Sequence, residues 1–435
     1  MIQNLADALF MPWVIGVLLL AGVWLSVRTG FVQVRRFAEA WRVAFVREAS
    51  DATGALTPFQ AFMTSLGASI GTGNIAGVAT AIVSGGPGAL FWIWVYGFLA
   101  MSIKFAEATL GMTFREPRGD TVLSGPMYYL RDGLKSPFLA TTFALVAAVA
   151  ALTTTPFTQP NSIALVVNSV FGIPKLAIGI AVAVLTWLVI IGGIKSIGRA
   201  AAKLSPIKVG LYLVGGLIVI GVNAARIPAV LSLVFSEALT MKSGLGFGLF
   251  MAMRYGVARG IYANEAGYGT AAVAYGTAKS AQPVFQGLNA IIEVFTVSFV
   301  TSTISAMTIL LTGVWQSGLT SSAAVAAGFN TVMPTFGGYI VAFCVFLFGY
   351  TTLIGWAYYG EQFFEYMLGR KVTVPYRWIY CLLIPFGAVT KVEVVWAWGD
   401  LMNALQVFPN LVGLLGLSGI VATYAREKLR AEAAK

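Results

Sequence analysis

Residues 65–79 read SLGASIGTGNIAGVA, and this stretch decides the fold because it interrupts an apolar run where a continuous helix is expected. The run extends from about Phe59 to Val83, which is long enough to cross a bilayer as a helix. Its middle carries four glycines and Asn74, and each glycine in a helix interior costs roughly 1 kcal/mol relative to alanine. Irregular backbone at membrane depth is tolerated only where protein buries it or where it lines a cavity. We therefore expect a helix that breaks at mid-membrane.

A broken helix exposes backbone groups that can bind ligands. Free carbonyls at such a break can hold a cation, and free amides can hold a carboxylate. This pattern predicts a transport site for a small zwitterion together with a coupling ion. The alternative is that the glycines only allow neighbouring helices to pack closely, and a single Gly-x-Gly does not separate the two interpretations.

The composition indicates a polytopic membrane protein with one transmembrane domain over residues 1–435. The chain is 58% hydrophobic and 10% charged, whereas a soluble domain carries about 25% charged residues. The sequence contains no histidine, and its two cysteines lie in apolar segments. An enzyme would need a nucleophile with a base, or a metal cluster, so we expect no enzyme activity and no organic cofactor.

The net charge of +11 comes from basic residues that cluster in alternate loops. Most of the 28 Lys and Arg residues fall in one set of loops and the C-terminal tail. Lys208 is one of them, because we expect it in a loop after residue 193. The other set holds only Lys175, Arg226, Lys242 and Lys391. By the positive-inside rule, the N-terminus lies outside and the C-terminus is cytoplasmic. We expect no nucleic-acid partner.

A second interrupted segment makes the packing alternative less favourable. The stretch RYGVARGIYANEAGYGTAA, Arg254 to Ala272, again mixes glycines and charges with apolar flanks, and we expect its helix to break at residues 260–263. We count about eleven membrane-spanning helices, of which the second and seventh are the broken ones. They are five spans apart and opposite in direction, as an inverted five-plus-five repeat predicts. The expected parts are an extra helix at 11–27, a first repeat at 56–226 and a second at 244–425. A long span from Pro137 to about Val170 should be kinked by Pro156 and Pro160.

Four motifs resemble the alanine or glycine:cation symporter family. They are GTGNIAGVATA in the first broken segment, RGIYANEAGYGTA in the second, and GWAYYGEQ and GDLMNALQVFPNLVGLLGLSG closer to the C-terminus. The resemblance covers nearly the whole chain. It implies an all-α, LeuT-like inverted-repeat fold and sodium-coupled uptake of alanine, glycine or a similarly small amino acid. The chain departs from the family at Tyr262-Ala263, where Phe-Ser is usual, and at Gln159-Pro160.

The resemblance also implies a sodium site. Thr351 and Thr352 would supply hydroxyl ligands, and the carbonyls of Gly67, Ile70 and Phe348 would complete the set. A hard cation requires several oxygen ligands, as this set provides. The alternative is that both threonine hydroxyls bond back to their own helix.

The substrate site implied by the resemblance lies beside the first break. The carboxylate would meet the amides of Thr72, Gly73 and Asn74 at the positive end of a half-helix, and the ammonium would meet carbonyls of both breaks, Ala263 included. The remaining implied residues are the polar side chain of Gln159 and the aromatic walls Tyr262 and Trp356. Walls so close to the α-carbon leave room only for a small side chain, although Trp356 in isolation would fit ordinary core packing equally well.

Ionisable residues within membrane segments mark functional sites or buried pairs. The resemblance gives Glu107 a structural role, as the acceptor of hydrogen bonds from the second broken helix. Glu265 and Asp400 lie in family motifs and are expected in gating or structural pairs.

The leading hypothesis is a sodium:alanine/glycine symporter, in monomeric form, in the cytoplasmic (inner) membrane of a prokaryote. The same fold with glutamine, serine or D-alanine as substrate, or with proton coupling, is the near alternative. A channel or a transport-inactive amino-acid sensor is the alternative from another class. A channel would be expected to show a filter motif, and the absence of histidine with the presence of Thr351-Thr352 favours sodium over protons.

Overall fold

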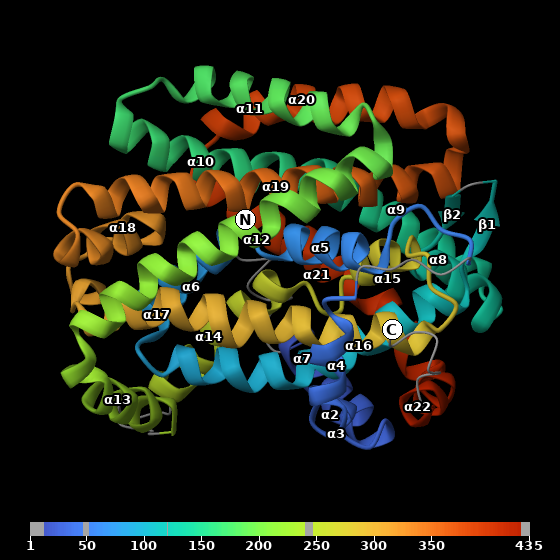
Figure 1. Cartoon of the computed structure of the whole chain (residues 1–435), viewed down its shortest axis with the longest axis horizontal. Helices are drawn as coiled ribbons and strands as arrows, with labels where there is room; N and C mark the ends of the chain where they lie inside the picture. Colours follow the sequence, from blue (N-terminus) through green and yellow to red (C-terminus); the bar gives the residue numbers. More distant parts are fainter. Residues whose placement is uncertain (1–12, 47–51, 120, 240–246, 428–435) are drawn as a thin grey trace.

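The computed structural model describes residues 13–46, 52–119, 121–239 and 247–427, and these residues are predominantly helical (Figure 1). A short antiparallel hairpin pairs β1 (Glu116–Arg118) with β2 (Thr121–Leu123). The helices of the first half are α2 (Ile15–Arg28), α3 (Val32–Arg35), α4 (Phe37–Val43), α5 (Pro58–Ser69), η2 (Thr72–Asn74), α6 (Ala76–Gly85), α7 (Ala89–Thr113), α8 (Pro126–Tyr128), η3 (Tyr129–Gly133), α9 (Pro137–Thr153), α10 (Thr155–Phe171), α11 (Lys175–Ile190), α12 (Gly193–Val222), η4 (Ala224–Arg226) and α13 (Ile227–Leu239).

The second half continues in the same manner. Its helices are α14 (Phe247–Asn264), α15 (Thr270–Gly276), α16 (Pro283–Phe295), η5 (Thr296–Thr301), α17 (Ser302–Leu311), η6 (Val314–Gln316), α18 (Ser321–Val332), α19 (Phe336–Leu368), η7 (Arg370–Val372), α20 (Thr373–Val389), α21 (Val392–Gly416) and α22 (Ser418–Arg426).

Long apolar helices confirm a polytopic membrane protein. Six spans among the described residues are long and apolar enough to cross a bilayer, and two bent helix pairs raise the number to as many as eight. One bent pair joins Pro58–Ser69 to Thr72–Gly85 at 58°, so the predicted break of the first segment is confirmed. The shorter apolar helices α2 and α11 stand outside this count, and the expected total of eleven stays a prediction.

The two broken segments lie in the interior of the bundle. Helix α5 packs against α12 and α19, while α14 packs against α6 and α7. Figure 1 shows α11 beside α20 at one edge, and α2, α3 and α22 at the opposite edge. The central helix α19 is the more deeply buried: 83% of its apolar part is buried, against 33% for the span Arg370–Val389, which contains the edge helix α20.

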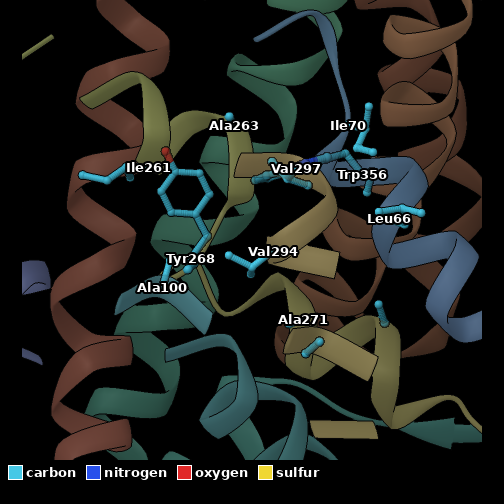
Figure 2. Close-up of a cluster of buried hydrophobic side chains, with 14 of the residues drawn as sticks. Leu66, Ile70, Ala100, Ile261, Ala263, Tyr268, Ala271, Val294, Val297 and Trp356 are labelled. Carbon is cyan, nitrogen blue, oxygen red and sulfur yellow. The ribbon is translucent and has the colours of Figure 1, made fainter. Parts of the chain in front are cut away.

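The buried apolar core surrounds both breaks. Figure 2 shows Leu66 and Ile70 of the first broken segment close to Trp356, with Ile261 and Tyr268 of the second broken segment on the other side of the cluster. All five of these side chains are buried. The core therefore fixes the two interrupted segments relative to each other.

The expected long span from Pro137 is divided at Thr154 into α9 and α10. Thr154 stays in the right-handed helical region, but its φ of −106° and ψ of −70° are distorted from ideal values, and Pro137–Phe171 still counts as one span. Pro156 follows in the first turn of α10, where a missing N–H leaves no gap in the hydrogen bonding. Pro160 lies inside α10. The distortion at Thr154 therefore falls in the turn before the two prolines, which is the part of a helix that a proline disturbs.

The second break lies C-terminal to its expected position. Helix α14 continues through residues 260–263 to Asn264, and the irregular backbone covers residues 265–269. Gly260 remains helical because its role is close packing: a Cβ there would lie 3.1 Å from the ring of Tyr96 on α7. The positive φ angles occur instead at Glu265, Gly267 and Gly269. The prediction of a break at 260–263 was therefore wrong, although the segment itself is broken.

A buried carboxylate holds the second break in place. Glu107 on α7 accepts hydrogen bonds from the amides of Gly267 at 2.8 Å and Gly269 at 3.0 Å, just before α15. It also accepts a bond of 2.8 Å from Asn410, whose amide group donates to the Gly267 carbonyl as well. These bonds satisfy backbone groups that the interruption leaves without helical partners.

Removing this carboxylate should destabilise the protein. We expect Glu107→Ala to lower the midpoint of thermal unfolding in mild detergent, because each buried donor left without an acceptor costs about 1–3 kcal/mol. The control is Glu116→Ala, which removes an ion-pair carboxylate that is 43% exposed and should cost at most about 1 kcal/mol. Equal midpoints for the two variants would contradict the role assigned to Glu107.

Candidate substrate and ion site

The first break leaves the carbonyls at the end of α5 without helical partners. Helix α5 ends at Ser69, and Ile70 follows with φ −76° and ψ 77°. The single turn of η2 then leads into α6. Backbone groups at such an end need partners from elsewhere in the protein.

Lys208 of α12 supplies one of these partners. Its ammonium nitrogen, Nζ, lies 2.9 Å from the Gly67 carbonyl oxygen and 2.6 Å from that of Ile70, and it also donates to the Thr351 hydroxyl. The Thr351 hydroxyl lies 3.0 Å from the Leu347 carbonyl oxygen and 3.1 Å from that of Phe348, so its one hydrogen bonds back to its own helix. A lysine ammonium therefore lies among four of the five residues expected to bind sodium.

The position of Lys208 corrects the sequence analysis, which placed this residue in a loop. Helix α12 extends from residue 193 to 222, and Lys208 is fully buried within it. Ser205 and Tyr212, three residues before and four residues after, are buried on the same helix. This polar spacing on one helix face is the signal that could have identified Lys208.

Other side chains satisfy the remaining groups of the first break. The Thr352 hydroxyl donates to the Ala68 carbonyl at 2.7 Å. The Gln159 side-chain oxygen accepts from the Thr72 amide at 3.1 Å and from the Thr72 hydroxyl at 3.0 Å. Gln159 thus reaches from α10 to the backbone amide that the sequence analysis assigned to a substrate carboxylate.

Glu265 occupies the second break in a strained backbone conformation. Its φ is 57°, in the left-handed region that non-glycine residues rarely adopt. Its buried carboxylate accepts a hydrogen bond of 2.6 Å from the Trp356 indole and one of 2.9 Å from the Thr270 hydroxyl. Strain of this kind persists where the surroundings fix the residue, and such positions cluster at functional sites.

A second buried lysine connects the two breaks. Lys104 of α7 forms a 2.6 Å ion pair with Glu293 of α16. Its ammonium also donates to the Ser69 hydroxyl at 2.7 Å and to the Asn264 carbonyl at 2.6 Å, the last residues of α5 and α14. Lys104 therefore pairs with Glu293 and not with Glu107, its neighbour on the same helix.

A small cavity of about 10 Å³ lies between the two breaks, close to the smallest space that holds one water molecule. The lining residues come from five different parts of the chain: Ala68, Ser69, Gly71, Gly73, Thr154, Thr155, Gln159, Tyr262, Glu265, Tyr268, Thr352, Trp356 and Asn403. Aromatic rings, hydroxyls, amides and one carboxylate therefore face a shared space, the mixture that a small polar ligand requires.

Two contacts close the cavity on the Tyr262 side. The Tyr262 hydroxyl donates to Thr158 at 2.9 Å, and its ring lies 5.0 Å from that of Trp396. Beyond it, Arg259 and Asp400 approach to 3.3 Å, and the Arg259 guanidinium lies 5.0 Å from the Trp396 ring centroid.

A larger cavity of about 570 Å³ opens farther along α19. Tyr358 lies in its wall, two residues after Trp356, and so do Glu361 and Arg377, which form a 2.6 Å ion pair. The wall also contains the basic residues Arg118, Lys195, Arg370 and Lys371.

The structure brings most of the expected site residues together. Gly73, Gln159, Tyr262 and Trp356 line the small cavity, and Thr352 and Glu265 lie in the same wall. Asn74 is directed elsewhere: its amide donates to the Gly71 carbonyl at 3.1 Å, and its side chain donates to Thr301 at 3.2 Å. Ala263 is buried in the last turn of α14. The sequence analysis did not identify some of the residues found here as site residues: Ser69, Thr154, Thr155, Tyr268, Asn403, Lys104 and Lys208.

The family model and the sequence relatives point to the same family of proteins. Residues 1–434 match the model of the sodium:alanine symporter family. The chain is 38% identical to the sodium/alanine symporter AgcS of Methanococcus maripaludis, over 98% of this chain and 96% of that protein. It is 33% identical to the probable sodium/glutamine symporter GlnT of Bacillus subtilis, over 97% and 90%.

Solved structures confirm the expected fold. MhsT in complex with L-phenylalanine superimposes with a TM-score of 0.65 over 88% of this chain and 94% of its own, at 13% identity. A substrate-bound Na⁺-coupled sialic acid symporter gives 0.57 over 98% and 96%, at 12% identity. At these identities the likeness concerns the fold alone, and it confirms the LeuT-like arrangement that the sequence motifs implied.

The contact between Gly73 and Tyr262 provides a test of the cavity. A Cβ at Gly73 would lie 2.6 Å from ring atom Cδ1 of Tyr262, so Gly73→Ala should displace the ring and destabilise the protein by about 1–3 kcal/mol. In the control, Gly77→Ala, the nearest atom is the Arg259 Cδ at an ordinary 3.6 Å. We expect a lower thermal unfolding midpoint for Gly73→Ala only, and equal midpoints would show that the ring is free to move away.

Proposed function

The chain belongs to the sodium:alanine symporter family, and on that premise we propose that it takes alanine, glycine or a similarly small neutral amino acid into the cell together with sodium. Transport would proceed by alternating access to the small cavity between the two broken helices. The observation that carries the proposal is this cavity, where polar groups from both breaks face one space under aromatic walls.

Both ends of an amino-acid zwitterion find complementary groups at this cavity. We assign the substrate carboxylate to the Thr72–Asn74 turn, where Gly73 lines the cavity and the N-terminus of α6 favours negative charge. Gln159, which now bonds to Thr72, would exchange that bond for one to the substrate. The ammonium would face Glu265 and the carbonyls near the end of α5. Asn74 and Ala263 do not line the cavity, and they would then contribute by shaping the backbone of the two breaks.

The cavity walls argue most directly for a small substrate. Tyr262 packs so closely against Gly73 that even one added carbon would overlap its ring. The Trp356 indole is fixed by its 2.6 Å bond to Glu265. A cavity of about 10 Å³ must widen even for alanine, so each additional methylene group in the substrate would require further displacement of packed side chains.

The route through the protein follows from the two cavities. We propose that the Tyr262 and Arg259–Asp400 contacts form the outer gate, and that the larger cavity beside α19 is the cytoplasmic vestibule, because basic residues line it. The N-terminus would then lie outside and the C-terminus inside. The remaining parts of the proposal are the inner membrane of a prokaryote as location and a monomer as the unit.

Binding of labelled alanine to the purified protein tests the proposal. We expect saturable binding in sodium chloride and none in potassium chloride at equal ionic strength. Equal binding in both salts would exclude sodium coupling. If alanine binds in neither salt and glutamine from a panel of amino acids binds displaceably, the substrate would be glutamine, as the name of the relative GlnT suggests for that protein.

Trp356→Ala should relax the size limit, because it removes a wall of the cavity. We expect the variant to bind leucine or phenylalanine in competition assays against labelled alanine, whereas the natural chain excludes both. Trp378→Ala is the matched control, since Trp378 is half exposed on α20 and packs against Trp187, and neither ring lines the cavity. If Trp356→Ala still excludes the larger amino acids, a different wall sets the limit.

A further inference from the structure

Lys208 is a buried cation without a carboxylate partner in the part of the chain that the structure describes. Its side chain is fully buried, and no described carboxylate oxygen lies within 4.0 Å of its ammonium. A buried charge is costly unless it is paired or fully hydrogen-bonded. The structure therefore has to provide another set of partners for Lys208.

Backbone and hydroxyl oxygens form that set. The ammonium has three N–H donors, and three acceptors surround it: the carbonyls of Gly67 and Ile70, and the hydroxyl of Thr351. The ring centroid of Phe348 lies 5.2 Å away, within range of a cation–π contact. We refer to the three oxygens of Gly67, Ile70 and Thr351 as the oxygen cage.

The cage has the chemistry of a sodium site, but a side chain of the protein already occupies its centre. Sodium would need the same carbonyl and hydroxyl oxygens that the ammonium binds. Two unit positive charges within one ligand set would repel each other strongly in a medium of low dielectric constant. The oxygen cage therefore holds either the lysine ammonium or a sodium ion, and not both.

We propose that Lys208 is the permanent cation of the oxygen cage, so that this cage binds no sodium and the coupling ion uses other oxygens of the protein. The inference deepens the proposed sodium coupling and rests on it. By linking α12 to the end of α5 and to α19, the ammonium keeps the first break closed from the cage side, as a bound sodium ion would, but without being exchanged in the transport cycle.

A pair of variants separates the charge of Lys208 from its volume. Lys208→Ala removes the ammonium and leaves space in the cage, whereas Lys208→Met removes the charge but fills the space. The measurement is thermal unfolding of the full-length purified protein in sodium chloride against choline chloride, without amino acid. We expect sodium to raise the midpoint of Lys208→Ala by on the order of a few degrees beyond its effect on the natural chain, and Lys208→Met to show no such gain.

The natural chain provides a test that does not depend on the folding of a variant. Thallium(I) is a heavy monovalent cation that anomalous diffraction locates in crystals. We expect no anomalous peak in the oxygen cage of the natural protein and a peak there in Lys208→Ala. A peak in the cage of the natural chain, or equal sodium responses of the Ala and Met variants, would overturn the proposal.

These readouts need no amino acid, and so they separate two kinds of failure. If labelled alanine does not bind to the natural chain in sodium, the proposed substrate is wrong while the assignment of Lys208 can still hold. If alanine binding requires sodium but thallium occupies the cage of the natural chain, the proposed function holds and the assignment of Lys208 is wrong.

Discussion

Backbone that leaves helical geometry in the middle of a membrane protein must find hydrogen-bond partners within the protein, because the bilayer offers none. The architecture of this symporter depends on that constraint. Its two interrupted segments expose carbonyls at the ends of α5 and α14 and amides at the start of α15. Neighbouring helices supply side chains to these groups, and in doing so they fix the position of each break.

The charges of these partners match the polarity of the helix ends. Carbonyl ends carry partial negative charge and amide ends partial positive charge. Lys208 meets the carbonyl end of α5, and Lys104 meets that of α14. Glu107 meets the amides that precede α15. Each ionised side chain thus stabilises a half-helix end of opposite sign, which explains why charges are retained in the interior of so apolar a chain.

The same arrangement produces the small cavity and limits its size. The cavity lies between the two sets of broken ends, so ligand groups of both signs can be bound within a few ångströms. The small residues that permit the breaks also let aromatic rings approach closely, as the Tyr262 ring does at Gly73. Close approach leaves little free volume, and a transporter built in this manner favours small substrates.

The amino-acid sequence alone was enough to predict the class of the protein, the existence of both interruptions and part of the cavity wall. Length and hydropathy suffice for a membrane helix, and glycine with asparagine in an apolar run marks a break because these residues weaken a helix wherever they occur. For this reason Gly73, Gln159, Tyr262 and Trp356 could be found from local motifs and family resemblance.

The position of the second break and the identity of the cation at the first break depend on tertiary contacts. Gly260 reads as a helix breaker, yet it remains helical because Tyr96 of a distant helix packs against it. Lys208 reads as a loop residue beside other basic residues, yet it lies in the interior because three oxygens from two other helices, α5 and α19, surround its ammonium. Both outcomes depend on contacts between segments far apart in the chain, and no local pattern records such contacts.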